Sequence, residues 1–451
     1  MFERTIIKEL EKWETRRPRK PLVLRGARQV GKTTLVDQYA RKFDNYLYLN
    51  LELAENRQPF EQFTNIETLV QTIFFLKNTV YSKDQRTLIF IDEIQESPEA
   101  LNILRYFYES YPDFYVIAAG SLLESLFRTD VSFPVGRVEY LVVRPASFPE
   151  FLNATGEDAA LTQLQKIPVP AFSHHKLLSL FHTYALIGGM PEVVNHYAQD
   201  KDLTGLQSIY ESLIVSYLDD VEKYASSQTQ VQTIRHAIRS SYTEAGKRIK
   251  FQGFGKSNYG SREMGEALRT LEKALLIYLL YPNTGVTLPL TPDLRKSPRL
   301  HVLDTGMLNY FVGVQKDILG TTDLNDIYQG TVIEHLVGQE LLASQFNTLS
   351  NLHFWVREKK TSVAEVDYVV QFDGKIIPVE VKSGTEGKLR SLHLFMDMAP
   401  HSLAVRFYAG EWSVTESTTP SGKKYHLLNL PYYLASQLSH CLEWFSREYG
   451  G

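Results

Sequence analysis

Short apolar runs alternate with stretches of helical spacing over the first third of the chain. The apolar runs are rich in β-branched and aromatic residues, and between them the apolar positions recur every three or four residues. Strand, crossover helix and strand repeated in this order predict a parallel sheet with helices on both faces. We therefore expect residues 1–146 to form one α/β domain, with strands at 22–26, 45–52, 87–95, 115–121 and 137–145.

The pattern becomes mostly helical after this domain. Helical spacing over residues 147–224 is broken by the turn-forming Gly188-Gly189-Met190-Pro191, and it predicts a helical lid. Residues 225–318 contain two or three helical runs, notably 262–280, followed by a Pro-rich stretch. This mixture is compatible with a winged helix-turn-helix.

A second, smaller α/β domain is expected over residues 319–451. A helical run at 331–344 precedes four apolar, β-rich runs. The predicted strands are 353–359, 364–372, 375–383 and 403–409. A chain of 451 residues is longer than one hydrophobic core normally supports, which agrees with a division into several domains.

Composition and charge narrow the function classes. The formal net charge of -4 provides no overall positive field, so any contact with nucleic acid has to be local. The short basic runs at 16–20 and 247–250 are weak support, because most such runs are solvated surface. The single cysteine, Cys441, excludes an intramolecular disulfide framework and fits a reducing compartment. The longest strongly apolar run, 274–281, is too short to span a bilayer and the N-terminus lacks the apolar core of a secretory signal, so we expect a cytoplasmic protein outside the membrane.

A glycine-rich segment follows the first predicted strand. Residues 26–33, GARQVGKT, have the spacing of a P-loop and lie between an apolar strand and a helix, as that motif requires. The glycines let backbone N–H groups converge on phosphate oxygens, while Lys32 neutralises the β/γ charge and the Thr33 hydroxyl ligates Mg²⁺. The predicted nucleotide-binding residues are Gly26, Ala27, Arg28, Gln29, Val30, Gly31, Lys32, Thr33, Thr34 and, at the end of a later strand, Ser121.

Two carboxylates end the third predicted strand. Asp92 is placed to hold the Mg²⁺ ion with Thr33, and Glu93 is placed to polarise water. Ser121 occupies a position from which a polar residue senses the γ-phosphate, and a loop serine without a role is the open alternative. Arg137 is a candidate for stabilising transition-state charge, in cis or across a subunit contact, with a plain surface arginine as the alternative. The sequence thus predicts ATP and Mg²⁺ as cofactors and Lys32, Asp92, Glu93 and Arg137 as catalytic residues.

A second cluster of charged residues is predicted in the C-terminal domain. Asp373-Gly374 is a two-residue hairpin signal between β-rich runs, and the register that it sets places Asp367 opposite Glu380 and Glu365 opposite Lys382. Opposed carboxylates repel unless a proton or a cation lies between them, and a divalent ion, Mg²⁺ or Mn²⁺, is the natural resolution.

The further ligand of this predicted metal site lies on the preceding helix. Glu334 is the better candidate and Glu340 the weaker one, while Lys382 is placed to steady developing charge. The alternative is a solvated strand face whose charges alternate by chance. Pro378 lacks an N–H and marks an edge or a bulge in many sheets, which would shift the strict pairing.

With these motifs assembled, the chain resembles the bacterial and archaeal family of AAA-type ATPases that carry a C-terminal domain of formerly unknown function, number 4143. The resemblance runs nearly end to end. It is carried by GARQVGKTT (26–34), FIDEIQ (90–95), AGSLLESL (119–126), GRVEYLVVRPASFPEFL (136–152), GGMPEVV (188–194), SPRLHVLDTGML (297–308) and EVDYVV followed by PVEVKSG.

The resemblance implies an ATPase core, a helical lid, a winged-helix-like middle segment and a terminal domain similar to the PD-(D/E)xK nucleases. On this likeness Asp367, Glu380 and Lys382 occupy the nuclease motif and Glu334 is its upstream acid. Residues 248–265 match the family's helix-turn-helix only loosely. Likeness of fold to nucleases does not establish cleavage, because one scaffold can bind without cutting.

Taken together, the sequence predicts an ATPase that couples nucleotide turnover to rearrangement of its middle and terminal domains. DNA or RNA is a candidate partner, and a homo-oligomer is a candidate assembly. The open alternative is a nucleotide-gated switch that hydrolyses ATP little and uses the terminal domain to hold a partner. Metal-dependent cleavage of nucleic acid is a separate prediction.

Overall fold

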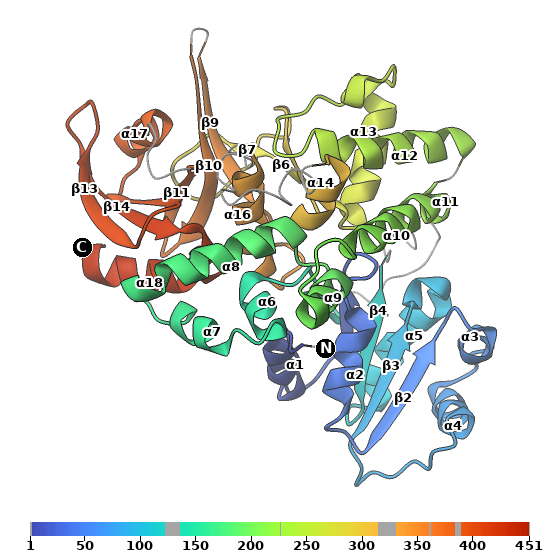
Figure 1. Ribbon diagram of the computed structural model, residues 1–451. Coiled ribbons are helices and arrows are strands. Elements are labelled where there is room, and N and C mark those ends of the chain that lie inside the picture. The colour runs from blue at the N-terminus through green and yellow to red at the C-terminus, as the bar shows by residue number, and fades with distance from the viewer. Residues whose placement is uncertain are drawn as a thin grey trace.

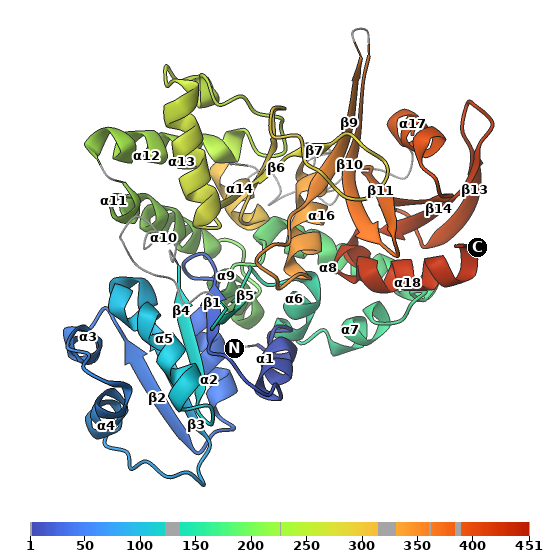
Figure 2. The ribbon, with the colours of Figure 1, turned by 180° about the vertical axis from the view of Figure 1, so that it is seen from behind.

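The computed structural model describes residues 2–121, 136–225, 227–313, 331–359, 362–383 and 389–450. Residues 122–126 of one family motif and residues 314–318 of the predicted middle segment therefore lie outside the described part of the chain. Figures 1 and 2 show the ATPase-like sheet at one end of the molecule and the C-terminal sheet at the other, with helices between them.

The N-terminal domain is a parallel five-stranded sheet in the order β2-β3-β4-β1-β5. Its strands are β1 (Leu22–Arg25), β2 (Asn45–Asn50), β3 (Thr87–Asp92), β4 (Tyr115–Gly120) and β5 (Glu139–Val142). The predicted strands are all present, and β4 lies between β1 and β3, pairing Ile117 with both Leu22 and Phe90. This insertion is typical of the additional-strand class of P-loop proteins, so the predicted α/β fold is confirmed.

Period-two alternation along the central strands explains why helices cover both faces of this sheet. On β1, Leu22 and Leu24 face one apolar core while Val23 faces the other. The first core includes α1 (Ile7–Glu14) and α2 (Lys32–Ala40), and the second includes α3 (Ala54–Glu61), α4 (Ile66–Leu76) and α5 (Pro98–Ser110). A short 3₁₀ turn at Ile94–Glu96 connects β3 to α5.

The predicted lid consists of helices joined by short connections, and its described residues include no strand. Its helices are α6 (Phe148–Ala154), α7 (Asp158–Leu164), α8 (His174–Ile187), α9 (Pro191–Asp200), α10 (Leu206–Asp219) and α11 (Val221–Tyr224), with a 3₁₀ turn at Ala171–Ser173. The predicted break falls between α8 and α9. A Cβ on Gly188 would lie 2.3 Å from Oδ1 of Asp304, so this turn packs directly against the residue that caps α14 (Thr305–Phe311).

The middle segment contains α12 (Gln228–Thr243), a 3₁₀ turn at Phe254–Lys256, α13 (Ser261–Lys273) and a two-stranded antiparallel sheet of β6 (Ile277–Leu280) and β8 (Arg299–Val302). The expected helix over 262–280 is wrong in its last part. The helix ends at Lys273, Leu275 has a φ of 60°, and the apolar residues that follow pair with β8 instead. An apolar run of this length fits a strand or a helix equally well, so periodicity alone could not separate them.

The exposed face of α13 carries both signs of charge. Arg262, Arg269 and Lys273 alternate there with Glu263 and Glu266, and Arg262 lies 3.4 Å from Glu266. This face therefore offers no stripe of one sign, and nucleic-acid binding by the segment stays a prediction.

The C-terminal sheet is mixed, in the order β13-β14-β12-β11-β10-β9-β7. It consists of β7 (Pro282–Asn283), β9 (His353–Lys359), β10 (Ser362–Phe372), β11 (Lys375–Val381), β12 (Leu403–Tyr408), β13 (Ser413–Thr418) and β14 (Lys424–Pro431). It is accompanied by α16 (Thr331–Ala343), α17 (Arg390–Met398), a 3₁₀ segment at Tyr432–Gln437 and α18 (Leu438–Tyr449). Trp412 and Trp444 pack edge to face here, with ring centroids 5.1 Å apart.

The predicted hairpin register is confirmed, because Tyr368 pairs with Val379 and Phe372 with Lys375 around the Asp373-Gly374 turn. Pro378 neither ends the sheet nor shifts this register. It lies in an interior strand, opposite Val369 on β10, and β12 pairs with β11 only from Val379 onward. The irregularity lies on the other side of β10, where the pairing with β9 shifts between Val366 and Val369.

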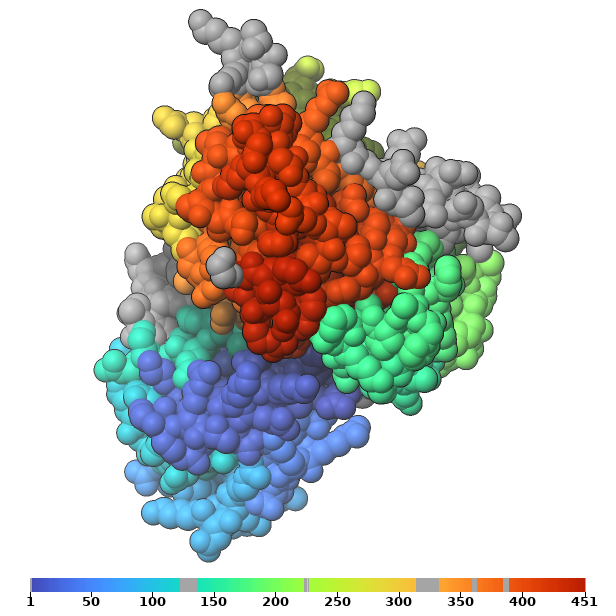
Figure 3. Space-filling view, turned by 90° about the vertical axis from the view of Figure 1, so that its left-hand side faces the viewer, coloured from blue at the N-terminus to red at the C-terminus, as the bar shows by residue number. Residues whose placement is uncertain are grey.

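The lid helices lie between the two sheets in Figures 1 and 2, and the side view in Figure 3 shows lid residues (green) against the C-terminal domain (orange to red). The rings of Phe181 on α8 and Tyr432 lie 6.4 Å apart, and Nδ1 of His174 lies 3.2 Å from the hydroxyl of Tyr433. Within the described residues, no helix is both long enough and apolar enough to cross a membrane.

Candidate functional site

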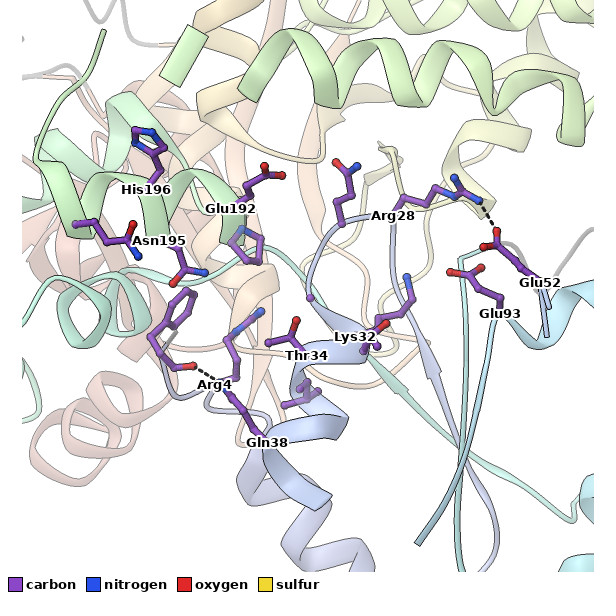
Figure 4. Close-up of a pocket in the computed structure, with 17 residues that line it drawn as sticks. Arg4, Arg28, Lys32, Thr34, Gln38, Glu52, Glu93, Glu192, Asn195 and His196 are labelled. Carbon is purple, nitrogen blue, oxygen red and sulfur yellow. Dashed lines mark hydrogen bonds and ion pairs between the residues drawn. The ribbon is translucent and has the colours of Figure 1, made fainter. Parts of the chain in front are cut away.

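A pocket of about 650 Å³ lies over the carboxyl end of β1, between the P-loop and the lid helix α9 (Figure 4). Its lining mixes backbone from residues 28–34 with side chains from the N-terminal arm, the end of β3 and α9. The lining residues are Phe2, Arg4, Arg28, Gln29, Gly31, Lys32, Thr33, Thr34, Leu35, Gln38, Glu52, Glu93, Pro191, Glu192, Asn195, His196 and Gln199.

The P-loop backbone has the shape that gathers N–H groups around an anion. Gln29 has a φ of 62° and Gly31 a φ of 87°, so left-handed residues recur along the loop and turn successive amides inward. Gly26 is required for a different reason. A Cβ at this position would lie 2.5 Å from the carbonyl oxygen of Val143, which follows β5.

Lys32 is buried beneath the loop, with 6% of its surface exposed. Its ammonium donates to the carbonyl oxygens of Gly26 at 3.0 Å and Ala27 at 2.9 Å. Burial lowers the pKa of Lys32 to about 8, although the carboxylates of Glu93 and Asp92 act in the opposite direction. A triphosphate in the pocket would supply the negative charge that this buried ammonium lacks.

Thr33 and Asp92 meet at the point where the Mg²⁺ ion of a P-loop protein is held. The Thr33 hydroxyl donates to Oδ2 of Asp92 at 2.7 Å, and the backbone N–H of Glu93 donates to Oδ1 at 3.0 Å. Burial raises the pKa of Asp92 above its usual range. A hydroxyl and a buried carboxylate are hard oxygen donors of the kind that Mg²⁺ prefers, so the residues present fit the ion.

Glu93 reaches the pocket because its backbone is left-handed, with a φ of 51°. This conformation is uncommon for a residue with a side chain and turns the chain sharply at the end of β3. The Glu93 carboxylate accepts a hydrogen bond from the side-chain amide of Gln95. The Gln95 amide thereby orients the Glu93 carboxylate on the same side of the site as Lys32. From this position the carboxylate can take a proton from an attacking water.

Arg28 connects the P-loop to the helical lid. Its Nε lies 2.8 Å from Oδ2 of Asp220 at the end of α10, and its terminal nitrogen lies 3.6 Å from Glu52 after β2. The Tyr217 hydroxyl donates to the Arg28 carbonyl oxygen at 2.9 Å. The loop that cradles phosphate is therefore held by side chains of α10.

Arg4 is a site residue that no motif in the sequence indicated. This buried arginine donates to the carbonyl oxygen of Val30 in the P-loop at 3.1 Å and to that of Arg144 at 2.6 Å. Its Nε lies 3.1 Å from Oε2 of Glu150, the buried carboxylate that caps α6. The N-terminal arm thus joins the P-loop to the lid.

The predicted residues Ser121 and Arg137 take different positions. Ser121 is buried at the carboxyl end of β4, the edge at which the P-loop begins, but it does not line the pocket. Arg137 precedes β5, and since β5 runs parallel to β1, it lies at the opposite edge of the sheet. There it is half exposed and paired with Glu109 at 3.0 Å. In this chain Arg137 does not reach its own nucleotide pocket, because the sheet separates them.

The structure brings the predicted C-terminal residues into one neighbourhood together with one that was not predicted, and Lys382 contacts Glu380 while Glu365 contacts Arg299. Oδ2 of Asp367 accepts the backbone N–H of Val381 at 2.8 Å, and the Lys382 ammonium contacts the Glu380 carboxylate. Burial, reinforced by the charge of Asp367, raises the pKa of Glu380 to about 8. The addition is Arg299, whose guanidinium contacts the carboxylates of both Glu334 and Glu365.

The described residues do not show the predicted second metal site. Within the described ranges, no group of three or more His, Cys, Asp or Glu side chains is arranged to hold a metal ion. Glu340, the weaker candidate ligand, lies elsewhere: its two oxygens accept the backbone N–H of Phe148, each at 3.1 Å, and one also accepts the Tyr184 hydroxyl at 2.6 Å. Its α-helix turns it toward the lid and away from Glu334.

Sheet order, P-loop and paired carboxylate define the N-terminal domain as a P-loop NTPase fold of the AAA type. Comparison with protein families agrees: an AAA domain matches residues 18–152, and domains of unknown function match residues 178–318 (DUF8612) and 329–433 (DUF4143). The chain thus combines an AAA domain with a DUF4143 domain at its C-terminal side. None of the curated proteins compared with the chain matches it.

Several solved structures are similar to parts of the chain. A Walker-type ATPase of Pyrococcus abyssi, PABY2304, is 14% identical over 69% of this chain and 96% of its own, with a TM-score of 0.44. PCH-2 of C. elegans is 13% identical over 40% of this chain and 55% of its own, with a TM-score of 0.25. A signal transduction ATPase of Pyrococcus horikoshii, PH0952, is 12% identical over 74% of this chain and 47% of its own, with a TM-score of 0.27.

Proposed function

We propose that the chain binds ATP with Mg²⁺ and hydrolyses it, and that occupancy of the pocket is transmitted to the lid. The observation that carries this proposal is the convergence of Lys32, the Thr33–Asp92 pair and Glu93 on one pocket. Mg²⁺ held by Thr33 and Asp92 would draw charge from the β- and γ-phosphates. Lys32 neutralises the phosphates and Glu93 accepts the proton of the attacking water.

Two contacts support transmission to the lid. Arg28 forms an ion pair with Asp220 at the end of α10, and Arg4 forms one with Glu150 on α6. Both arginines also line the pocket. A nucleotide that repositions the P-loop must therefore act on both lid helices. This supports the predicted coupling, with the DUF4143 domain beyond the lid as the element that responds.

Phosphate release from ATP tests the proposal. We expect Lys32→Ala to lose nucleotide binding, and Glu93→Gln to bind ATP normally but turn it over about 10²–10⁴-fold more slowly. Glu55→Gln, an exposed carboxylate on α3 outside the pocket, is the matched control and should keep the wild-type rate. Equal rates for wild type, Lys32→Ala and Glu93→Gln would refute hydrolysis at this site.

The same measurements separate the ATPase from the nucleotide-gated switch. A switch would bind ATP tightly in the wild type, release almost no phosphate, and change little in Glu93→Gln. Steady turnover that falls in Glu93→Gln while ATP affinity is retained supports the ATPase.

A further inference from the structure

Arg299 begins β8 in the middle segment, yet its side chain ends in the C-terminal domain. It is buried, with 4% of its surface exposed, and its guanidinium contacts Glu334 on α16 and Glu365 on β10. It also donates to the backbone carbonyl oxygen of Asp367 at 3.2 Å, and it lies 4.8 Å from the ring centroid of Phe354 on β9. One side chain thus joins four elements.

A cation is needed at this position. Glu334, Glu365, Asp367 and Glu380 bring four carboxyl groups into one partly buried region, and carboxylates that lose water without a partner are strongly unfavourable. A divalent ion is one solution. A guanidinium is another, because it is planar, permanently charged and has five N–H donors to share between carboxylates.

The partners that the carboxylate oxygens already have decide between a divalent ion and a guanidinium. Arg299 uses an oxygen of Glu334 and one of Glu365, the Val381 N–H uses Oδ2 of Asp367, and Lys382 uses Oε1 of Glu380. Oε2 of Glu380 is buried without a hydrogen-bond partner. A divalent ion in a protein takes several oxygen ligands around one point. Each of the four carboxyl groups already has a partner on one oxygen, and within the described residues they form no group arranged to hold a metal ion, so the residues as arranged do not fit the metal that the nuclease likeness implies.

We propose that Arg299 is the resident cation of this acidic site. The chain's own guanidinium, supplied by the middle segment, stands where a nuclease-like domain would hold a divalent ion. While Arg299 is in place the site is closed to divalent ions, and the middle segment is clamped to the C-terminal sheet. Withdrawal of the guanidinium would free the Glu334 carboxylate and leave Glu365 with Arg248 alone, whose terminal nitrogen lies 3.8 Å from Oε2 of Glu365. Both carboxylates would then lie beside Asp367 and Glu380 and create a divalent site. This inference does not depend on ATP hydrolysis.

Mn²⁺ binding to the full chain without nucleotide tests the proposal, with free Mn²⁺ counted by electron paramagnetic resonance. Asp92→Asn is used as the common background, so that the P-loop contributes no bound ion. We expect no bound Mn²⁺ in this background, one ion per chain after Arg299→Met is added, and none again after Asp367→Asn is added to both. Arg295→Met is the matched control, because the Arg295 side chain is largely exposed and, within the described part of the chain, forms its ion pair with Asp293.

Two results would overturn the proposal. The first is a Mn²⁺ ion bound while Arg299 is intact and lost in Asp367→Asn. The second is a folded Arg299→Met protein that binds no Mn²⁺. If Arg299→Met fails to fold, the protein with Arg299 intact still decides the question, since saturable Mn²⁺ binding removed by Asp367→Asn contradicts the proposal and its absence supports it. The clamp also predicts a lower thermal midpoint for Arg299→Met and an unchanged one for Arg295→Met.

Discussion

The Thr33 hydroxyl donates to Oδ2 of Asp92 at 2.7 Å, although Thr33 lies in the first turn of α2, after β1, and Asp92 ends β3, which β4 separates from β1. Two oxygen ligands of Mg²⁺ are therefore positioned before any ion arrives. We expect Thr33→Val and Asp92→Asn to raise the Mg²⁺ concentration that half-maximal ATPase activity requires, by at least about tenfold. Thr33→Ser keeps the hydroxyl and should behave as wild type. Unaltered Mg²⁺ dependence in Asp92→Asn would contradict this role.

Gly26 is predicted to tolerate no side chain. A Cβ there would lie 2.5 Å from the carbonyl oxygen of Val143, so Gly26→Ala must displace either the P-loop or the end of β5. We expect a loss of about 1–3 kcal/mol of stability together with loss of ATP binding. Gly285→Ala is the control, because an added Cβ would meet nothing closer than 3.9 Å. Thermal unfolding with and without ATP measures both effects, and equal behaviour of the two variants would disprove the steric account.

Nucleotide binding should take up a proton near pH 8. Burial holds the pKa of Lys32 at about 8 in the empty site, and the charge of a triphosphate raises it on binding. Because the bound form has the higher pKa, ATP affinity should fall as pH rises above 8, by up to about tenfold per pH unit. Calorimetry at pH 8 in buffers of different ionisation enthalpy counts the protons. Heats that do not vary with the buffer would show that Lys32 is already charged.

Glu340 should make the stability of the chain depend on pH. Burial raises its pKa to about 7 from the ordinary value of 4.5, so the folded chain favours the protonated form. This stabilisation is complete below pH 4.5 and is lost as pH rises through 7. Relative to Glu340→Gln, the wild type should therefore lose about 3 kcal/mol of unfolding free energy between pH 4.5 and 7. Urea denaturation of both proteins measures the difference, and parallel pH curves would contradict it. The exposed Glu443→Gln is the control.

The contributions of Arg4 and Glu150 to the free energy of unfolding should be coupled, because each charge stabilises the folded chain only when the other is present. Removing one member leaves the other buried and uncompensated, so Arg4→Met should cost about 3–5 kcal/mol. The double variant Arg4→Met with Glu150→Leu replaces both charges by apolar groups and should recover part of that loss. A double-mutant cycle on the thermal midpoint measures the coupling, and strictly additive losses would show that the two residues act independently.

Local signals in the sequence predicted the parts of the molecule that depend on neighbouring residues. The strands of the first sheet follow from apolar runs, and the hairpin register follows from Asp373-Gly374, whose φ angles of 45° and 70° match the turn that this dipeptide favours. The P-loop followed from spacing because its chemistry is contained in one short segment.

Contacts between distant segments were not predictable in the same way. Arg4 and Arg299 lie in segments with no motif of their own for phosphate or carboxylate, and their partners are 26 to 146 positions away. At 277–280 the apolar run fits a helix or a strand equally well, and only the pairing with β8, which follows after a long connection, decides for the strand. A signal for Arg299 was present in the family motif at 297–308, although nothing in that motif named its partners.

The chain has four tryptophans, and three of them, Trp355, Trp412 and Trp444, lie on the C-terminal sheet or its last helix. The fourth, Trp13, is a buried residue of α1, and none of the four lines the nucleotide pocket. Intrinsic emission therefore comes mainly from the end of the molecule farthest from the phosphate loop. Any ATP-dependent change in the intensity or wavelength of this emission would be a label-free signal that nucleotide binding alters the conformation of the C-terminal domain.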